Sequence, residues 1–199
     1  MRRLILPLLV VGVLVIGCGG DEPSLGGART YYESLDLASP REAVATFADA
    51  FQRNDFMTVW LVLDADAQLH LQQDLNMAQW GQFFDTAASP EYRTALETEV
   101  FPFQSWDSHD SWEFFDRLML MADGHDAFLI DLSGQVNVTG ESPSAGWGYT
   151  DLTAEVEGIE GDVIFRMAQA PSGKWRVHQV IAPGGDEQSV PWSVPAPNG

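Results

Sequence analysis

The chain has 199 residues, of which 45% are hydrophobic, and its 29 acidic and 10 basic residues give a formal net charge of −19. This length allows one domain of ordinary size with tails, and the hydrophobic content is sufficient for a core. The single cysteine excludes a disulfide framework and a multi-cysteine zinc or iron–sulfur site. The acidic excess argues against nucleic acid and anionic lipid surfaces as partners, because phosphate groups are bound by Lys and Arg.

The N-terminus has the layout of a secretory signal. Arg2 and Arg3 precede an apolar run from Leu4 to Ile16. This run is shorter than the roughly 20 residues that a membrane-spanning helix needs. Residues 15–18, Val-Ile-Gly-Cys, resemble the lipobox of bacterial lipoproteins. The resemblance implies a signal peptide over residues 1–17, cleavage before Cys18 and attachment of lipid to its thiol. An ordinary signal peptide with a chance cysteine, or an uncut anchor, is the alternative.

Lipidation at Cys18 would place the chain in the bacterial cell envelope, outside the cytoplasm. Two or three acyl chains hold a protein durably to a membrane, whereas one chain gives marginal binding. Gly19 follows the cysteine where an Asp would stand in the inner-membrane signal of enterobacteria. By resemblance to those sorting rules, the outer membrane is slightly favoured.

The composition divides the rest of the chain into three parts. Residues 18–37 begin with glycines, a proline and a serine, which are typical of a flexible tether. Residues 183–199 form a tail rich in proline and glycine, which excludes a helix or a central strand there. The domain is therefore expected over residues 38–182.

Helices are predicted in the first part of this domain. Ser39, Pro40 and Glu42 have the pattern of an N-cap, a first helical residue and a capping box. Asp55 is expected to cap a second helix directly afterwards. Residues 67–122 are expected to be mostly helical, with further helices starting after Ser89 and Ser111.

The pattern changes to alternation after residue 124. Strands are predicted over residues 152–156, 163–167 and 175–181, with an apolar run at 127–130 before them. Gln179 interrupts the alternation of the last strand. Helices followed by a hairpin-rich sheet indicate an α+β fold, with N-terminal helices packed on an antiparallel sheet.

Two segments, residues 39–66 and 150–181, resemble the nuclear-transport-factor-two-like (SnoaL-like) superfamily. The resemblance implies a cone-like α+β roll, in which a curved sheet wraps helices and leaves an open pocket. Members include isomerases, dehydratases, hydrolases, ligand binders and subunits without chemistry, so the fold alone does not give a function. It also implies a possible homodimer. Residues 67–149 do not follow the family pattern.

Aromatic residues are concentrated between residues 80 and 115. They predict either a pocket or partner face, or simply a filled core, which is the favoured interpretation. The candidates for such a face are Trp60, Trp80, Phe83, Phe84, Trp106 and Trp112.

Acidic residues and histidines occur together at several points. The pairs and clusters are Asp64 with Asp66, Asp107 with His109 and Asp110, and His125 with Asp126. Such groups suit a metal or acid–base chemistry, but none has a metal-binding spacing, so no metal and no cofactor are expected. Arg176 and His178 lie on the last predicted strand and are expected to face solvent.

Two functions remain. The first and favoured one is a lipid-anchored module whose domain binds an apolar small molecule or another envelope protein. The alternative is a small pocket enzyme of the isomerase, dehydratase or hydrolase type, with a buried Asp or His as general base. The sequence does not identify catalytic residues, and no nucleic-acid partner is expected.

Overall fold

The computed structural model describes residues 25–73, 89–100, 111–144, 148–185 and 190–193. The chain divides into two units, residues 1–33 and 34–199. Helix α1 (Leu25–Ser34) begins in the first unit, within the segment expected to be a flexible tether. Helix α1 starts two residues after Pro23 and contains no proline itself, so every residue of α1 has an amide that can take part in helical hydrogen bonds. None of the described helices has the length and apolar character needed to cross a bilayer.

The second unit starts with the two predicted helices. Helix α2 (Pro40–Gln52) begins where the Ser39 hydroxyl accepts a hydrogen bond from the Glu42 amide. Helix α3 (Phe56–Val62) follows after a tight turn, and the Asp55 carboxylate accepts hydrogen bonds from the amide and the hydroxyl of Thr58. Both N-caps satisfy amides that lack a partner inside the helix, as the sequence predicted.

In the described parts of residues 65–124, four further helical segments follow. They are α4 (Ala65–Gln73), α6 (Pro90–Ala95), the π-helical turn η1 (Leu96–Val100) and α7 (Ser111–Gly124). The Ser89 hydroxyl caps α6 through the amide of Tyr92, which confirms the predicted start. Helix α7 begins at Ser111, one residue before the predicted start, and packs against α3.

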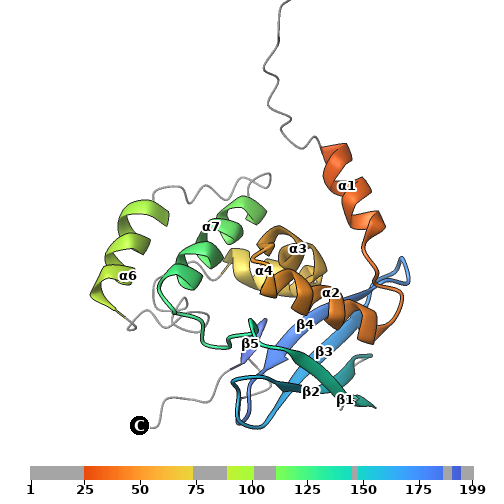
Figure 1. Ribbon diagram of the computed structural model, residues 1–199. Coiled ribbons are helices and arrows are strands. Elements are labelled where there is room, and N and C mark those ends of the chain that lie inside the picture. Colours follow the sequence, from red (N-terminus) through yellow and green to blue (C-terminus); the bar gives the residue numbers. More distant parts are fainter. Residues whose placement is uncertain (1–24, 74–88, 101–110, 145–147, 186–189, 194–199) are drawn as a thin grey trace, which may run out of the picture. The chain divides into compact units, whose positions relative to one another are not determined.

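The C-terminal part forms a five-stranded sheet in the order β1-β2-β3-β4-β5 (Figure 1). The strands are β1 (Val136–Pro143), β2 (Thr150–Val156), β3 (Asp162–Gln169), β4 (Trp175–Ile181) and β5 (Trp192–Ser193). The first four form an antiparallel meander, whereas β5 is parallel to β4. The sheet is therefore mixed and open, so the expectation of a wholly antiparallel sheet was wrong. The fold class, helices packed on a sheet, is α+β as predicted.

Two segments near the sheet, residues 136–143 and 127–130, differ from the sequence prediction. Strand β1 was not expected, because its residues are mostly polar and only partly buried. The apolar run at residues 127–130 does not form a named strand. It follows Asp126, which has a left-handed φ of 52°, and within it the half-buried Phe128 packs against Phe51 and Phe56.

Left-handed backbone at two residues turns the chain after helices. Asn54, with a φ of 56°, separates α2 from α3, and Asp126, with a φ of 52°, follows α7. Asn and Asp tolerate this conformation better than most residues, because their short polar side chains hydrogen-bond locally. At Asn54 the side-chain amide also donates to Asp123 Oδ2 at 2.9 Å, which ties this turn to the end of α7.

The core lies between the helices and the sheet. Figure 1 shows α2, α3 and α4 gathered on the side of β3 and β4, and α2 contacts β4. The ring of Phe47 on α2 lies 6.3 Å from Phe165 on β3 and 6.0 Å from Trp192 on β5. These rings are almost completely buried, so apolar area removed from water holds α2 to the sheet.

Candidate functional site

A β-bulge on β4 places the histidine at the centre of the candidate site. Arg166 of β3 pairs with Gln179 of β4, and the next β3 residue, Met167, pairs with Val177. His178 is therefore an extra residue without a partner on β3. Bulges of this kind redirect a side chain and are frequent beside functional sites.

The segment between α3 and α4 brings Asp64 to the same place. Leu63 forms a parallel bridge with Val177, and the Asp64 amide donates to the Val177 carbonyl at 2.8 Å. Asp64 Oδ1 then accepts a hydrogen bond from the Ala67 amide at 2.7 Å, as an N-cap of α4 does. The backbone bond to β4 and the cap to α4 fix the carboxylate of Asp64 in one position.

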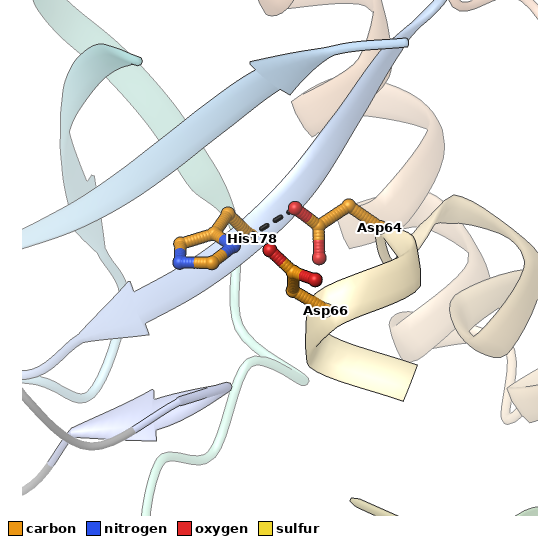
Figure 2. Close-up of side chains that lie close together, drawn as sticks. All are labelled: Asp64, Asp66 and His178. Carbon is orange, nitrogen blue, oxygen red and sulfur yellow. Dashed lines mark hydrogen bonds and ion pairs between the residues drawn. The ribbon is translucent and has the colours of Figure 1, made fainter. Parts of the chain in front are cut away.

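His178 and Asp64 form a hydrogen-bonded pair, drawn as a dashed line in Figure 2. His178 Nδ1 lies 2.8 Å from Asp64 Oδ2, and the two side chains are only 11% and 13% exposed. The Asp64 carboxylate can only accept a hydrogen bond, so Nδ1 carries the proton and donates it, and in the neutral imidazole Nε2 carries the lone pair. Among the described residues, Nε2 has no hydrogen-bond partner.

Tyr149 covers the face of this imidazole. Its ring centroid lies 4.5 Å from that of His178, with 22° between the planes. Burial raises the pKa of the Tyr149 phenol above its ordinary value of 10.0, and the charges of Asp64 and Asp66 raise it further, while Arg166 lowers it in part. Each cause except Arg166 disfavours the phenolate, so the hydroxyl stays protonated at neutral pH and can donate a hydrogen bond.

Asp66, on the first turn of α4, completes a group of three possible metal ligands. One ligand atom from each of Asp64, Asp66 and His178 lies within 4.8 Å of the others. In Figure 2 both carboxylates point toward the Nδ1 side of the imidazole. Asp66 is exposed, and in the part of the chain that the structure describes its carboxylate has no hydrogen bond or ion pair. An imidazole beside two carboxylates is a donor set that divalent transition metals accept.

A buried polar row supports the site from β2, β3 and β5. Arg166, 7% exposed, donates to both carboxylate oxygens of Asp151, at 2.9 and 3.0 Å, and to Gln179 Oε1 at 3.3 Å. Gln179 Nε2 in turn donates to Ser193 Oγ at 2.7 Å. A two-point arginine–carboxylate contact has a defined geometry, so it holds β2 and β3 in register beside β4.

The structure changes the interpretation of four residues that the sequence analysis considered. Asp64 and Asp66, noted in the sequence as one of several acidic groups that suit a metal or acid–base chemistry, both belong to the group around His178. His178 itself was expected to face solvent, and this was wrong, because the bulge turns it toward Asp64 and leaves it 9% exposed. Arg176 is half-buried and donates to the Leu63 carbonyl at 3.4 Å. The candidate site residues did not include Tyr149.

The aromatic candidates lie elsewhere. Trp60 is 7% exposed and packs its ring 5.2 Å from Phe115, between α3 and α7, which is a core position. Trp112, at the start of α7, is partly exposed. The remaining candidates lie outside the described residues, and they are Trp80, Phe83, Phe84 and Trp106.

The other groups of acids and histidines are not brought to this site. His125 and Asp126 form a turn after α7, where the His125 ring lies 5.4 Å from Tyr92. His125 also lines an open pocket of about 350 Å³ between η1 and α7, together with Glu99 and Arg117. Asp107, His109 and Asp110 lie outside the described residues, as does the predicted lipid-attachment residue Cys18.

Comparison with known proteins adds no identification. No protein-family model matches the chain, and neither the curated proteins nor the solved structures give a significant match.

Proposed function

We propose that this chain is a lipid-anchored protein of the bacterial cell envelope, with its α+β domain outside the cytoplasm. The support is in the sequence: a basic start, a short apolar run, and the lipobox-like residues 15–18 with the only cysteine of the chain. Acyl chains on Cys18 would hold the domain at a membrane, with the outer membrane slightly favoured by Gly19. The strongly acidic domain would then remain in the aqueous phase beside the lipid.

Metabolic labelling tests the anchor. Cells that produce the native chain or its Cys18→Ser variant are fed a labelled fatty acid, and the purified chains are compared. Label on the native chain and none on the variant supports the proposal. An unlabelled native chain, or one that retains Met1, contradicts it.

For the fold, we propose a nuclear-transport-factor-two-like roll in which the sheet curves around α2 and α3. Two features support this. The helix pair precedes an antiparallel meander in the chain order that the family resemblance implies, and both aromatic contacts of Phe47 join α2 to that sheet. A homodimer is part of the same proposal and rests on the resemblance alone.

For the domain, we propose a ligand-binding module whose polar contacts are made by His178 and Tyr149. One observation carries this proposal: His178 is fixed by Asp64 at Nδ1, yet its Nε2 has no partner among the described residues. Nε2 offers an acceptor and the Tyr149 hydroxyl a donor. Because Asp64 and Asp66 make the surroundings negative, a neutral molecule with a hydroxyl or N–H group, or a cation, fits better than an anion.

Nuclear magnetic resonance of the histidine side chains tests this binding, with phenol as a neutral probe and benzoate as an anionic one. We expect phenol to shift the His178 ¹⁵N resonances with saturation, and benzoate to have a weaker effect. The exposed His70 and the turn residue His125 are internal controls. Equal shifts of all three histidines, or no saturable shift of His178, would contradict the proposal.

General-base catalysis at the same position is a second candidate, favoured by the 2.8 Å contact between Asp64 and His178. A carboxylate at Nδ1 orients the imidazole and stabilises its positive charge when Nε2 takes a proton. The probe 5-nitrobenzisoxazole tests this, because it loses a ring proton to a base while its N–O bond breaks, giving a coloured phenolate. A rate above free imidazole that His178→Gln abolishes and His125→Gln leaves unchanged supports catalysis; a rate equal in all three proteins excludes it.

A further inference from the structure

We infer that Asp64, Asp66 and His178 bind a divalent transition-metal ion such as Zn²⁺ on the Nδ1 side of the imidazole. This goes beyond the proposed function, in which a ligand is contacted at Nε2 and at the Tyr149 hydroxyl. The inference begins with geometry, since ligand atoms of the three side chains already lie within 4.8 Å of one another. Zn²⁺ is held at about 2.0–2.2 Å by imidazole nitrogen and carboxylate oxygen, so small side-chain rotations complete the site.

Rigid elements hold two of the three ligands. His178 is fixed by the bulge in β4 and is 9% exposed, and Asp64 is fixed by its bonds to the Val177 carbonyl and the Ala67 amide. These contacts use the Asp64 amide and Oδ1, so Oδ2 stays available when a metal replaces the proton between it and Nδ1. A preformed pair of ligands reduces the ordering cost of binding a metal.

The third ligand gives an entry path from solvent. Asp66 is exposed, stands on the first turn of α4, and has no competing partner among the described residues. Its carboxylate can therefore close over an arriving ion without breaking another contact. Three protein ligands leave a fourth position for water, which is the arrangement of open rather than structural zinc sites.

The local charge also favours a cation. Asp64 and Asp66 contribute two carboxylates, and both act on the nearby Tyr149 hydroxyl. The buried Arg166 is already paired with both oxygens of Asp151, and Arg176 donates to the Leu63 carbonyl. A divalent ion would neutralise the two carboxylates directly. The single imidazole distinguishes the site from an all-oxygen calcium or magnesium site, which hard cations prefer.

Binding would change the imidazole without net loss of a proton. The metal takes the Nδ1 lone pair, the proton leaves Nδ1 to solvent, and Nε2 acquires one, so Nε2 changes from acceptor to donor. This tautomer change gives a site-specific signature in the ¹⁵N spectrum of His178.

The test uses the purified full-length chain, treated with a chelator and titrated with Zn²⁺ by calorimetry, and with Co²⁺ by visible absorption. We expect one equivalent to bind and Nδ1 of His178 to carry the metal-induced shift. His178→Ala, Asp64→Asn and Asp66→Asn should each weaken binding by about tenfold or more, since even supporting residues of metal sites have effects of that size. The matched controls are His70→Asn, one turn along α4 from Asp66, and His125→Asn, which should bind as the native chain does.

Each possible outcome either supports or overturns the proposed metal site. Loss of binding in the three variants but not in the controls supports the site. Binding that His70→Asn removes, binding of Ca²⁺ or Mg²⁺ in preference to Zn²⁺, or no saturable binding at all overturns it. Circular dichroism of each variant verifies folding, and Asp66→Asn keeps the test decisive if His178→Ala does not fold, because Asp66 is exposed. Saturable phenol binding without zinc binding would reject the metal alone and leave the proposed function standing.

Discussion

The Nδ1 atom of His178 lies 2.8 Å from Oδ2 of Asp64, although the two residues are separated by 114 positions in the chain. The contact joins the extra residue of the β4 bulge to the start of α4. It therefore links the sheet to the helical layer through two side chains that are almost fully buried.

Removal of the Asp64 side chain should destabilise the domain. Asp64→Ala loses both the hydrogen bond to His178 and the cap on Ala67. A cap is worth about 1 kcal/mol and a hydrogen bond to a charged group about 1.5–3 kcal/mol, so we expect a loss of about 2–4 kcal/mol in the free energy of unfolding. Urea unfolding measures it. Asp64→Asn keeps a capping oxygen and should lose less; equal losses for both variants would show that the cap contributes nothing.

The Arg166–Asp151 ion pair should be more costly to break. The two side chains are 9% and 17% exposed, so Arg166→Met leaves Asp151 as a poorly solvated charge. Breaking a buried pair on one side costs about 3–5 kcal/mol. Urea unfolding gives the free energy of unfolding of Arg166→Met, of Asp151→Leu and of the double variant. We expect the double variant to lose less than the two single losses together, and simple additivity would contradict the coupling.

Asp116 should make the stability depend on pH. Burial raises the pKa of this carboxyl above 3.8, and the charge of Asp55 raises it further. The folded state therefore binds the Asp116 proton more tightly than the unfolded state does. As the pH rises from 3.8 through the folded pKa, ionisation of this carboxyl lowers the free energy of unfolding. Above that range the loss of stability is complete.

The variant Asp116→Asn removes this penalty. We expect it to unfold at a higher urea concentration than the native chain at neutral pH, with the difference vanishing below pH 3.8. Asp123→Asn and Glu113→Gln, on the same helix, are unsuitable as controls because Asp123 binds Asn54 and Glu113 itself acts on Asp116; Glu160→Gln, at an exposed turn, serves instead. If Asp116→Asn raised the unfolding urea concentration equally at neutral pH and below pH 3.8, the stabilisation would not come from the Asp116 charge, and the prediction would be wrong.

Tyr149 should report the charge of its neighbours. Burial raises its pKa most, followed by Asp64 and Asp66. Asp66→Asn removes one of these charges and should move the Tyr149 pKa down toward 10.0, without reaching it because the burial persists. Resonances of the labelled tyrosine ring measure the titration, and Tyr149→Phe identifies the signal. An unchanged or higher pKa in Asp66→Asn would show that Asp66 does not act on the phenol.

Local signals were sufficient to predict several helix starts. Ser39 and Asp55 cap α2 and α3 through amides three residues ahead, an interaction that depends only on neighbouring sequence. By contrast, β1 was missed. Its side chains are mostly exposed or half-buried, so it lacks the alternation of apolar residues that identifies a strand. The parallel strand β5 was missed as well, since only two residues pair with β4.

The candidate site could be predicted only in part. The proximity of Asp64 to Asp66 is visible in the sequence, but their partner His178 is brought there by a bulge and by the bridge from Leu63 to Val177. One signal was present. Gln179 breaks the alternation of apolar residues on β4, and a break of that kind inside a strand indicates an inserted residue, which here is His178.

Both borders of the described sheet are obstructed against pairing with other chains, each in a different way. On one border, β5 pairs with Val180 and Ile181 of β4, and Leu63 forms a bridge with Val177. On the other, β1 has an irregularity between Val138 and Gly140, and Arg41 donates to the Val138 carbonyl at 3.3 Å. An interrupted, charge-bearing border is a poor template for strand addition. Copies of this domain at high local concentration would therefore resist joining into fibrils through their backbones.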